Sequence, residues 1–379
     1  MVKVEVMDPE NKTQARRFLD LPFRLYDRHP QWVPPVLDDI KLMLNRKKHP
    51  FYEHSEAEFY LATRDGKDVG RLAVMNNHRF NDYHHTQQAQ FYLFECEDSD
   101  ETAQALFERA FDWARARGLN QCIGPKGFGA LDGYGILVEG FEHRQMMTMM
   151  NYNYPYYPRL LEKLGFEKEV DFASFYVTPD QFRMPPVVHK IAERAIKRGT
   201  FQVLRFRNKQ EMIKKWAHPL GEAYNKTFVN NWEYYPLSNR EIDLLVESLI
   251  LILDPRLVKL ITHADQLVGF TLAFADVSEA LQRARGNLPW WEPWKLADLL
   301  LNMRSTKWVS LNGNGILPEY HGLGGNALLY SEMEKTLRES TFQHAELTQI
   351  AESAVDMRQD VMRVGGKLYK NHRVYRRKL

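Results

Sequence analysis

Two stretches of the chain repeat one another about half a chain apart, and this repeat is the feature that most limits the fold. The segment LATRDGKDVG, residues 61–70, matches LITHADQLVG, residues 260–269, at a constant offset of 199 residues. Each segment has two runs suited to β-strands on either side of a short turn, which is the pattern of a β-hairpin. Two later glycine turns, at Gly165 and Gly365, lie 200 residues apart. The sequence therefore predicts one folding unit used twice.

Length and composition fit two globular domains. The chain has 379 residues, a length at which a single hydrophobic core usually gives way to two domains, and 44% of the residues are hydrophobic. Between the halves, Pro179, Pro185 and Pro186 form a stretch that neither a helix nor a central strand accepts. We expect a first domain over residues 1–178, a linker over 179–200 and a second domain over 201–379. Strands alternate with helices in both halves, so each is predicted to be an α/β fold with a mixed sheet.

Charge and cysteine content exclude several classes of protein. The chain carries 51 Lys and Arg against 49 Asp and Glu, so nucleic acid is not expected as a partner. Cys96 and Cys122 are too few for a disulfide framework, and no ligand spacing predicts a metal site. Acidic residues interrupt the N-terminal stretch where a secretory signal needs an apolar run, and no apolar run is long enough to cross a bilayer. A soluble, cytoplasmic protein without a membrane partner is expected, and a homo-oligomer is left open.

The sharpest local signal is the sequence GILPEYHGLGGNALL, residues 315–329. It predicts a strand, a glycine loop and a helix, an arrangement whose free N–H groups suit a phosphate or pyrophosphate. A tight turn that binds nothing is the alternative. Residues 322–327 also fit the GxGxxA dinucleotide fingerprint, with Glu346 as a ribose-binding acid. That interpretation is weaker, because Pro318 interrupts the strand and little chain follows for further βαβ units.

This loop resembles that of the GNAT superfamily of acyl-CoA-dependent N-acyltransferases. The family pattern is Gln or Arg, two residues, Gly, one residue, then Gly or Ala, and His321, Gly324 and Asn326 occupy its fixed positions. The resemblance implies that the loop binds the pyrophosphate of acetyl-CoA or another acyl-CoA, and that the preceding strand pairs with pantetheine. The cofactor-binding residues that it implies are Gly315, Ile316, Leu317, His321, Gly322, Leu323, Gly324, Gly325, Asn326 and Ala327.

The first half resembles the same family through residues 156–166, which end in Leu-Gly-Phe. Its corresponding loop, residues 95–101, is acidic and lacks glycine, so it should repel a pyrophosphate. We therefore expect two GNAT-like domains in tandem, of which only the second binds coenzyme A. The stretch Trp32–Pro35 is similar to one found in a widespread bacterial group of double-domain proteins.

Catalytic and acceptor-binding residues are less clearly marked. Glu352 follows an alternating strand and is our candidate for the general base, although a surface carboxylate would look the same. The glycine-rich segment 124–140 and the tryptophan insert 287–294 are expected to line an acceptor pocket, or else to be packed connections. The expected substrate-binding residues are Lys126, Asp132, Trp290, Trp291 and Trp294.

The resemblance implies an acyltransferase that moves an acetyl or other acyl group from acyl-CoA to the amine of a small molecule or peptide. Positioning of the two reactants would supply most of the catalysis. One alternative is a Fem-like transferase that uses aminoacyl-tRNA, and the basic tail 367–379 is its only support. Another is a non-catalytic coenzyme A-binding sensor or scaffold. It is favoured by the loop substitutions and by Leu161 and Val361, which stand where many family members have a tyrosine.

Overall fold

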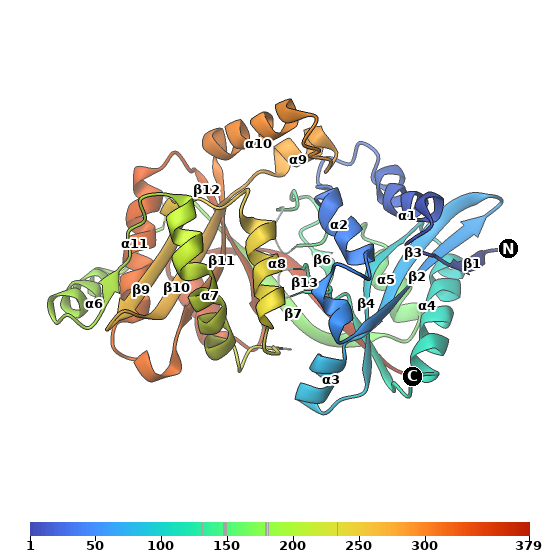
Figure 1. Cartoon of the computed structure of the whole chain (residues 1–379), viewed down its shortest axis with the longest axis horizontal. Helices are drawn as coiled ribbons and strands as arrows, with labels where there is room; N and C mark the ends of the chain where they lie inside the picture. Colours follow the sequence, from blue (N-terminus) through green and yellow to red (C-terminus); the bar gives the residue numbers. More distant parts are fainter. Residues whose placement is uncertain (130–131, 147–149, 179, 181, 233) are drawn as a thin grey trace. The chain divides into compact units, whose positions relative to one another are not determined.

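The chain divides into two compact units. The computed structural model (Figure 1) describes residues 1–379 except 130–131, 147–149, 179, 181 and 233, so Pro179 and part of the segment 124–140 lie outside the described residues. Unit 1 consists of Met1–Ala173, Ser278–Lys295 and Tyr369–Leu379, and unit 2 consists of Ser174–Val277 and Leu296–Leu368. Each unit combines strands of a mixed sheet with covering helices, so the predicted fold class is confirmed.

In unit 1 the strands follow the order β1-β2-β3-β4-β5-β13, with the first part of β7 beside β13. The bounds are β1 (Lys3–Val6), β2 (Glu56–Arg64), β3 (Lys67–Asn76), β4 (Gln88–Cys96), β5 (Gln121–Gly124), β6 (Ile136–Glu139), β7 (Glu167–Val177) and β13 (Lys367–Lys378). β4 and β5 are parallel, and β6 pairs with β13. The sheet therefore combines local hairpins with strands from distant parts of the chain.

Helices cover both faces of the unit 1 sheet. They are α1 (Lys12–Leu25), α2 (Leu37–Leu44), α3 (His78–His84), α4 (Asp100–Arg115), α5 (Tyr157–Lys163) and α9 (Ser278–Ala284). Neighbouring residues of β3 face helices on opposite sides of the sheet. A Cβ at Gly70 would lie 2.8 Å from Leu106 of α4, whereas Arg71 donates to the carbonyl of Phe18 in α1. From α9, the amide of Gln282 donates to the carbonyl of Trp32, which joins this distant segment to unit 1.

In unit 2 the order is β7-β12-β11-β10-β9-β8, where β7 contributes its last residues. The strands are β8 (Gln202–Val203), β9 (Val258–His263), β10 (Gln266–Ala275), β11 (Trp308–Ile316) and β12 (His344–Ala351). The helices are α6 (Pro186–Lys197), α7 (Lys209–Thr227), α8 (Asn239–Leu249), α10 (Pro293–Ser305), α11 (Gly325–Glu339) and α12 (Val355–Arg363) (Figure 1). Thr227 of α7 lies over Gly315 on one face of β11, and Gly325 of α11 lies against Ile316 on the other.

The two predicted hairpins share their fine structure. Each has a two-residue turn in the left-handed region, Asp65-Gly66 between β2 and β3 and Ala264-Asp265 between β9 and β10. Each also has a register shift just before the matched glycine, so that Gly70 pairs with Ala62 and Gly269 pairs with Ile261. A bulge is an irregular feature that independent hairpins would not be expected to place alike. The predicted repeat is therefore confirmed for the hairpins.

The units differ from the expected halves in three segments. The end of the chain, in β13, pairs with β5 of unit 1, and the insert with α9 also belongs to unit 1. Helix α6 occupies most of the range expected to be a linker, since its prolines stand before or within the first turn, where a missing N–H costs nothing.

The basic tail, residues 367–379, contains the paired strand β13. Lys370 is 2% exposed and donates to the carbonyl of Arg144, and Arg373 forms a bidentate ion pair with Asp171. Arg376 lies 3.3 Å from Glu169. These contacts occupy cations on which the aminoacyl-tRNA alternative relied.

His372 of β13 should make the stability of the protein sensitive to acid. The side chain is fully buried and bonds to the carbonyl of Asn151 at 2.9 Å, and burial lowers the pKa of His372 to about 4. The unfolded chain, with an ordinary histidine pKa, binds the proton more readily. Stability from this group is therefore complete above about pH 6.5 and is lost as the pH falls toward about 4, by about 2–3 kcal/mol.

Urea unfolding of wild type and His372→Gln across that range measures this effect. The variant can still donate to Asn151 and should lose part of the pH slope. Equal slopes in wild type and His372→Gln would contradict the assignment.

Candidate functional site

The edge of β11 that faces β12 is open along half of its length. β11 pairs with β10 from Val309 to Ile316, but its parallel pairing with β12 covers only Trp308–Leu311. Beyond Leu311 the two parallel strands separate, and a register shift in the β10 pairing falls at the same level. Backbone groups of Gly313, Asn314 and Gly315 on this edge are thus available to an extended ligand, which can bind there as a further strand does.

The loop after β11 turns the chain back toward the sheet. Leu317 donates to the carbonyl of Val268, and a short 3₁₀ helix, Pro318–Tyr320, follows. The ring of His321 bonds to the carbonyl of Ile316 at 3.0 Å, so this side chain fastens the loop to the strand. Gly322 and Gly324 have φ angles of +76° and +92°, a conformation that only glycine adopts easily.

Helix α11 begins directly after this loop with its N–H groups uncapped. Gly324 is its N-cap, no side chain caps the helix, and its first turn contains no acidic residue. A Cβ at Gly325 would lie 2.9 Å from Ile316, so glycine allows the helix to start close against the strand. Asn326 and the loop residues Gly322 and Leu323 are exposed. A helix N-terminus of this kind is electropositive and suits a phosphate group.

In the equivalent loop of unit 1, carboxylates stand at the N-terminus of the helix, where a phosphate would otherwise bind. Only three residues, Glu97 to Ser99, separate β4 from α4. Ser99 caps α4, and Asp100 and Glu101 stand in its first turn. Asp98 and Asp100 form ion pairs with Arg159 of α5, and Asp100 also pairs with Lys163. The positive end of this helix is therefore already compensated, and exclusion of a pyrophosphate from unit 1 stays a prediction.

The strand edge of unit 1 is closed as well. Cys96 pairs with Gly70 as Ile316 pairs with Gly269, so the two residues are equivalent. The N–H of Cys96 donates to the hydroxyl of Tyr157 at 3.0 Å, and its carbonyl accepts from Tyr156 at 2.7 Å. Neighbouring Glu95 accepts from the hydroxyls of Tyr26 and Tyr157, and burial raises the pKa of Glu95 despite the nearby Arg71. Side chains of unit 1 thus occupy the edge that unit 2 leaves open.

A polar cluster beside the α11 N-terminus was missed by the sequence analysis. Asn314 of β11 accepts from the hydroxyl of Thr271 at 2.5 Å and donates to Asn326 and to the hydroxyl of Tyr330, at 3.1 and 3.3 Å. Burial raises the pKa of Tyr330 to about 12, so its hydroxyl stays protonated at neutral pH. The cluster holds α11 against β11. Its only sequence signal is the Asn-Gly-Asn-Gly run of residues 312–315.

Aromatic rings lie on the other face of β11. The ring of Phe270 and the methyl group of Thr227 would touch a Cβ at Gly315, at 3.0 and 2.5 Å. Phe228, which follows α7, lies 5.8 Å from Phe270 and 4.8 Å from Tyr224, measured between ring centroids. Unit 2 therefore has an apolar wall next to the glycine-rich strand. The residues come from separate segments, and sequence analysis did not associate them.

The other predicted site residues lie elsewhere, and their roles stay predictions. Glu352 is half-buried in the turn after β12 in unit 2. In unit 1, Lys126 is buried with its ammonium 4.0 Å from the Phe80 ring centroid. The carboxylate of Asp132 accepts from the N–H of Gly129, and burial raises the pKa of Asp132 to about 7. Trp290, Trp291 and Trp294 are 86%, 62% and 63% exposed.

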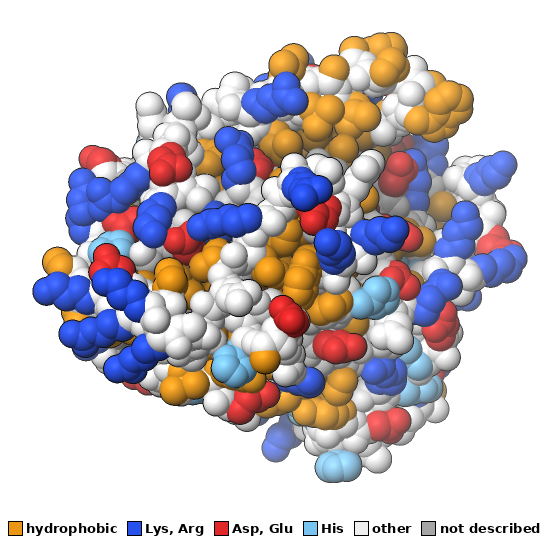
Figure 2. Space-filling model, turned by 60° about the vertical axis from the view of Figure 1, so that its left-hand side comes forward, with side chains coloured by type: hydrophobic (Ala, Val, Ile, Leu, Met, Phe, Trp, Pro, Cys, Tyr) orange, Lys and Arg blue, Asp and Glu red, His pale blue; other side chains and the backbone are white. Residues whose placement is uncertain are grey.

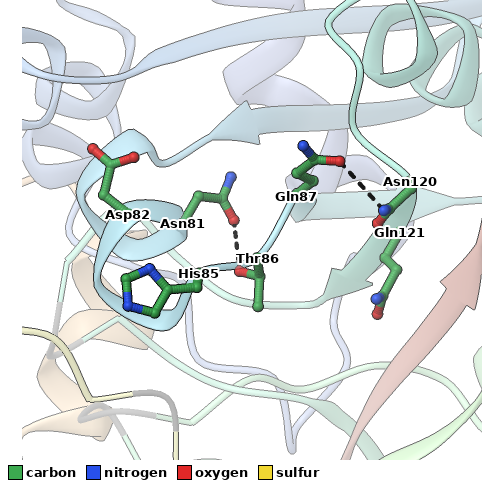
Figure 3. A pocket seen from close by; sticks show the side chains of 7 residues that line it. All are labelled: Asn81, Asp82, His85, Thr86, Gln87, Asn120 and Gln121. Carbon is green, nitrogen blue, oxygen red and sulfur yellow. Dashed lines mark hydrogen bonds between the residues drawn. The ribbon is translucent and has the colours of Figure 1, made fainter.

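A polar hollow in unit 1 contains none of the predicted site residues (Figure 3). It is lined by Asn81, Asp82, His85, Thr86, Gln87, Asn120 and Gln121. Thr86 donates to Asn81 at 2.9 Å, and Asn120 donates to Gln87 at 3.4 Å, so these side chains partly satisfy one another (Figure 3). Nothing in its lining resembles the loop and helix of unit 2, which we therefore take as the candidate site.

Comparison with solved structures defines the class of fold. A tandem GNAT protein from the clavulanic acid biosynthesis pathway superposes with a TM-score of 0.57, covering 100% of this chain and 98% of that one at 12% identity. The chain thus has the tandem GNAT fold, as the sequence predicted.

Two curated proteins match it along nearly their whole length. The bacterial ceramide synthase of Caulobacter vibrioides is 28% identical over 99% of this chain and 98% of its own. Protein YghO of Escherichia coli is 22% identical over 97% and 94%. No family model matches the chain.

Proposed function

We propose that the protein is an N-acyltransferase that binds acyl-CoA in unit 2 and transfers its acyl group to an amine. The observation that carries the proposal is the uncapped N-terminus of α11 beside the open edge of β11. The helix end suits a pyrophosphate, and the strand edge suits an extended amide-containing arm. Coenzyme A joins these two groups in one molecule.

Each part of the site would have its own role in binding acyl-CoA or in catalysis. The first turn of α11, from Gly325 to Ala327, would hold the pyrophosphate, and Gly315 to Leu317 would align the pantetheine arm. Bound acyl-CoA would supply a thioester carbonyl that an amine can attack. Glu352 remains our candidate to take the proton of the amine, and the aromatic wall of unit 2 would exclude water from the reacting groups.

A long-chain amine is the acceptor that we propose. One relative of nearly equal length is named a ceramide synthase, and a ceramide is the fatty-acid amide of a long-chain amine. The wall formed by Tyr224, Phe228 and Phe270 is apolar, as such substrates require. A fatty acyl-CoA is the matching donor.

Thiol release tests the proposal directly. The purified protein is incubated with acetyl-CoA or a long-chain acyl-CoA, together with sphinganine or a short amine, and free thiol and amide product are both measured. We expect release with the long-chain pair and the matching amide by mass spectrometry. Binding of coenzyme A without release with any amine would instead support the sensor. Salt-sensitive binding of tRNA would support the Fem-like alternative.

A further inference from the structure

Helix α10 leaves several large apolar side chains exposed. Trp294 and Leu301, which lie seven residues apart and so on one side of the helix, are both 63% exposed, and Leu300 is 37% exposed. Leu299 and Asn302, by contrast, are 1% and 8% exposed and face the interior. A helix on the surface of a water-soluble protein normally buries most of its large apolar side chains.

The segment just before α10 exposes further apolar side chains. Trp290 and Trp291 are 86% and 62% exposed, and their rings lie nearly perpendicular with centroids 5.7 Å apart. We call Trp290, Trp291, Trp294, Leu296, Leu300 and Leu301 the apolar cap; it is one continuous stretch of chain. Hydrophobic side chains gather at the top of Figure 2, the level at which Figure 1 shows α10. Leaving several large apolar side chains in water is costly unless something covers them.

The composition of the cap points to a lipid surface. Indole rings are favoured where water meets hydrocarbon, because their body is apolar and their N–H can still be hydrogen-bonded. Arg304 is exposed on α10 three residues after Leu301, and Lys307 is exposed just beyond the helix. These cations complement anionic lipid headgroups, whereas they would have to be paired in a dry protein interface. In the described part of the chain, no helix is long and apolar enough to span a membrane.

We propose that the apolar cap docks the protein on the surface of a lipid bilayer, with the indoles at the headgroup level. This differs from the expectation of no membrane partner, which rested on the lack of a spanning segment. A bilayer accepts exposed indoles and leucines without a complementary shape. The proposal rests on the surface alone and stands whatever acceptor the protein uses.

Vesicle flotation tests the docking without any substrate. Wild type and the triple variant Trp290→Ser/Trp291→Ser/Trp294→Ser are mixed with vesicles of phosphatidylethanolamine and phosphatidylglycerol and centrifuged through a density gradient. We expect wild type to float with the vesicles. The partition coefficient of the triple variant should be lower by about tenfold or more, because the variant loses most of the apolar area that the bilayer would bury. The three side chains are exposed, so the variant should keep the wild-type unfolding midpoint.

The matched control is Val355→Ser/Met362→Ser, which removes apolar side chains of α12 that are 54% and 53% exposed. It should float like wild type. Quenching of tryptophan fluorescence by brominated lipids should occur in wild type and weaken in the triple variant. Equal flotation of wild type and triple variant would overturn the proposal. So would a wild type that stays off the vesicles and forms a dimer that the triple variant breaks, since a second copy would then cover the cap.

Discussion

The Gly324→Val variant should lose affinity for coenzyme A, by about a hundredfold or more. Gly324 has φ +92°, which a β-branched residue adopts only with strain of about 1–3 kcal/mol. A Cβ there would also lie 3.0 Å from Ile191 and 3.4 Å from Ala195 of α6. The first turn of α11 must therefore shift, and the N–H groups no longer converge on one point. Calorimetric titration with coenzyme A measures the loss.

A matched control distinguishes an effect specific to the α11 loop from the effect of backbone strain elsewhere in the protein. Gly66 has φ +78° and open space around its Cβ position, in the hairpin turn of unit 1. Gly66→Val introduces a similar local strain far along the chain from α11, and it should bind coenzyme A with wild-type affinity. If Gly324→Val keeps its affinity while folded, coenzyme A does not bind at this loop.

Placing a negative charge in the first turn of α11 should weaken coenzyme A binding about tenfold without destabilising the protein. Asn326→Asp keeps the size of an exposed side chain and the oxygen that accepts from Asn314. A carboxylate at a helix N-terminus stabilises the helix by about 0.3–1 kcal/mol, so the melting temperature should stay the same or rise. The same charge repels a pyrophosphate bound a few ångströms away, by about 1 kcal/mol or more in partly aqueous surroundings.

The reverse change in unit 1 is the control for this charge effect. Asp100→Asn removes a carboxylate from the first turn of α4, together with its ion pairs to Arg159 and Lys163. Coenzyme A affinity should not change, and stability should fall only slightly, because the pairs are exposed and screened by solvent. Loss of affinity in both variants, or in neither, would argue against a binding site confined to unit 2.

The sequence was most informative where local chemistry determines local structure. The two hairpins could be predicted because strand-forming residues flank turns such as Asp65-Gly66, and their common offset showed that the unit is repeated. The loop and helix after β11 were predictable because the glycines at 322, 324 and 325 are needed for the left-handed turns and for close packing. The acidic loop of unit 1 could also be recognised from sequence, because residues 95–101 contain several carboxylates and no glycine.

Contacts between distant segments could not be predicted in this way. Nothing in the sequence of residues 367–378 says that the neighbour of this strand is β5. The cluster around Asn314 and the rings around Gly315 likewise combine residues whose meeting depends on the finished sheet. The tryptophan insert was expected to line a pocket, because exposed indoles are unfavourable in water. The exposure of Trp290, Trp291 and Trp294 depends on how the finished fold packs, which the insert's own sequence does not determine.

The position of β13 links the order of synthesis to the order of folding. Tyr375 to Lys378 pair with β5 in unit 1, so the first unit lacks a central strand until the end of the chain has been made. N-terminal domains usually fold first on the ribosome, but here the nascent first unit has an unfilled gap beside β5 and needs protection from aggregation. A chain that stops before β13 would therefore damage the first unit as well as the second.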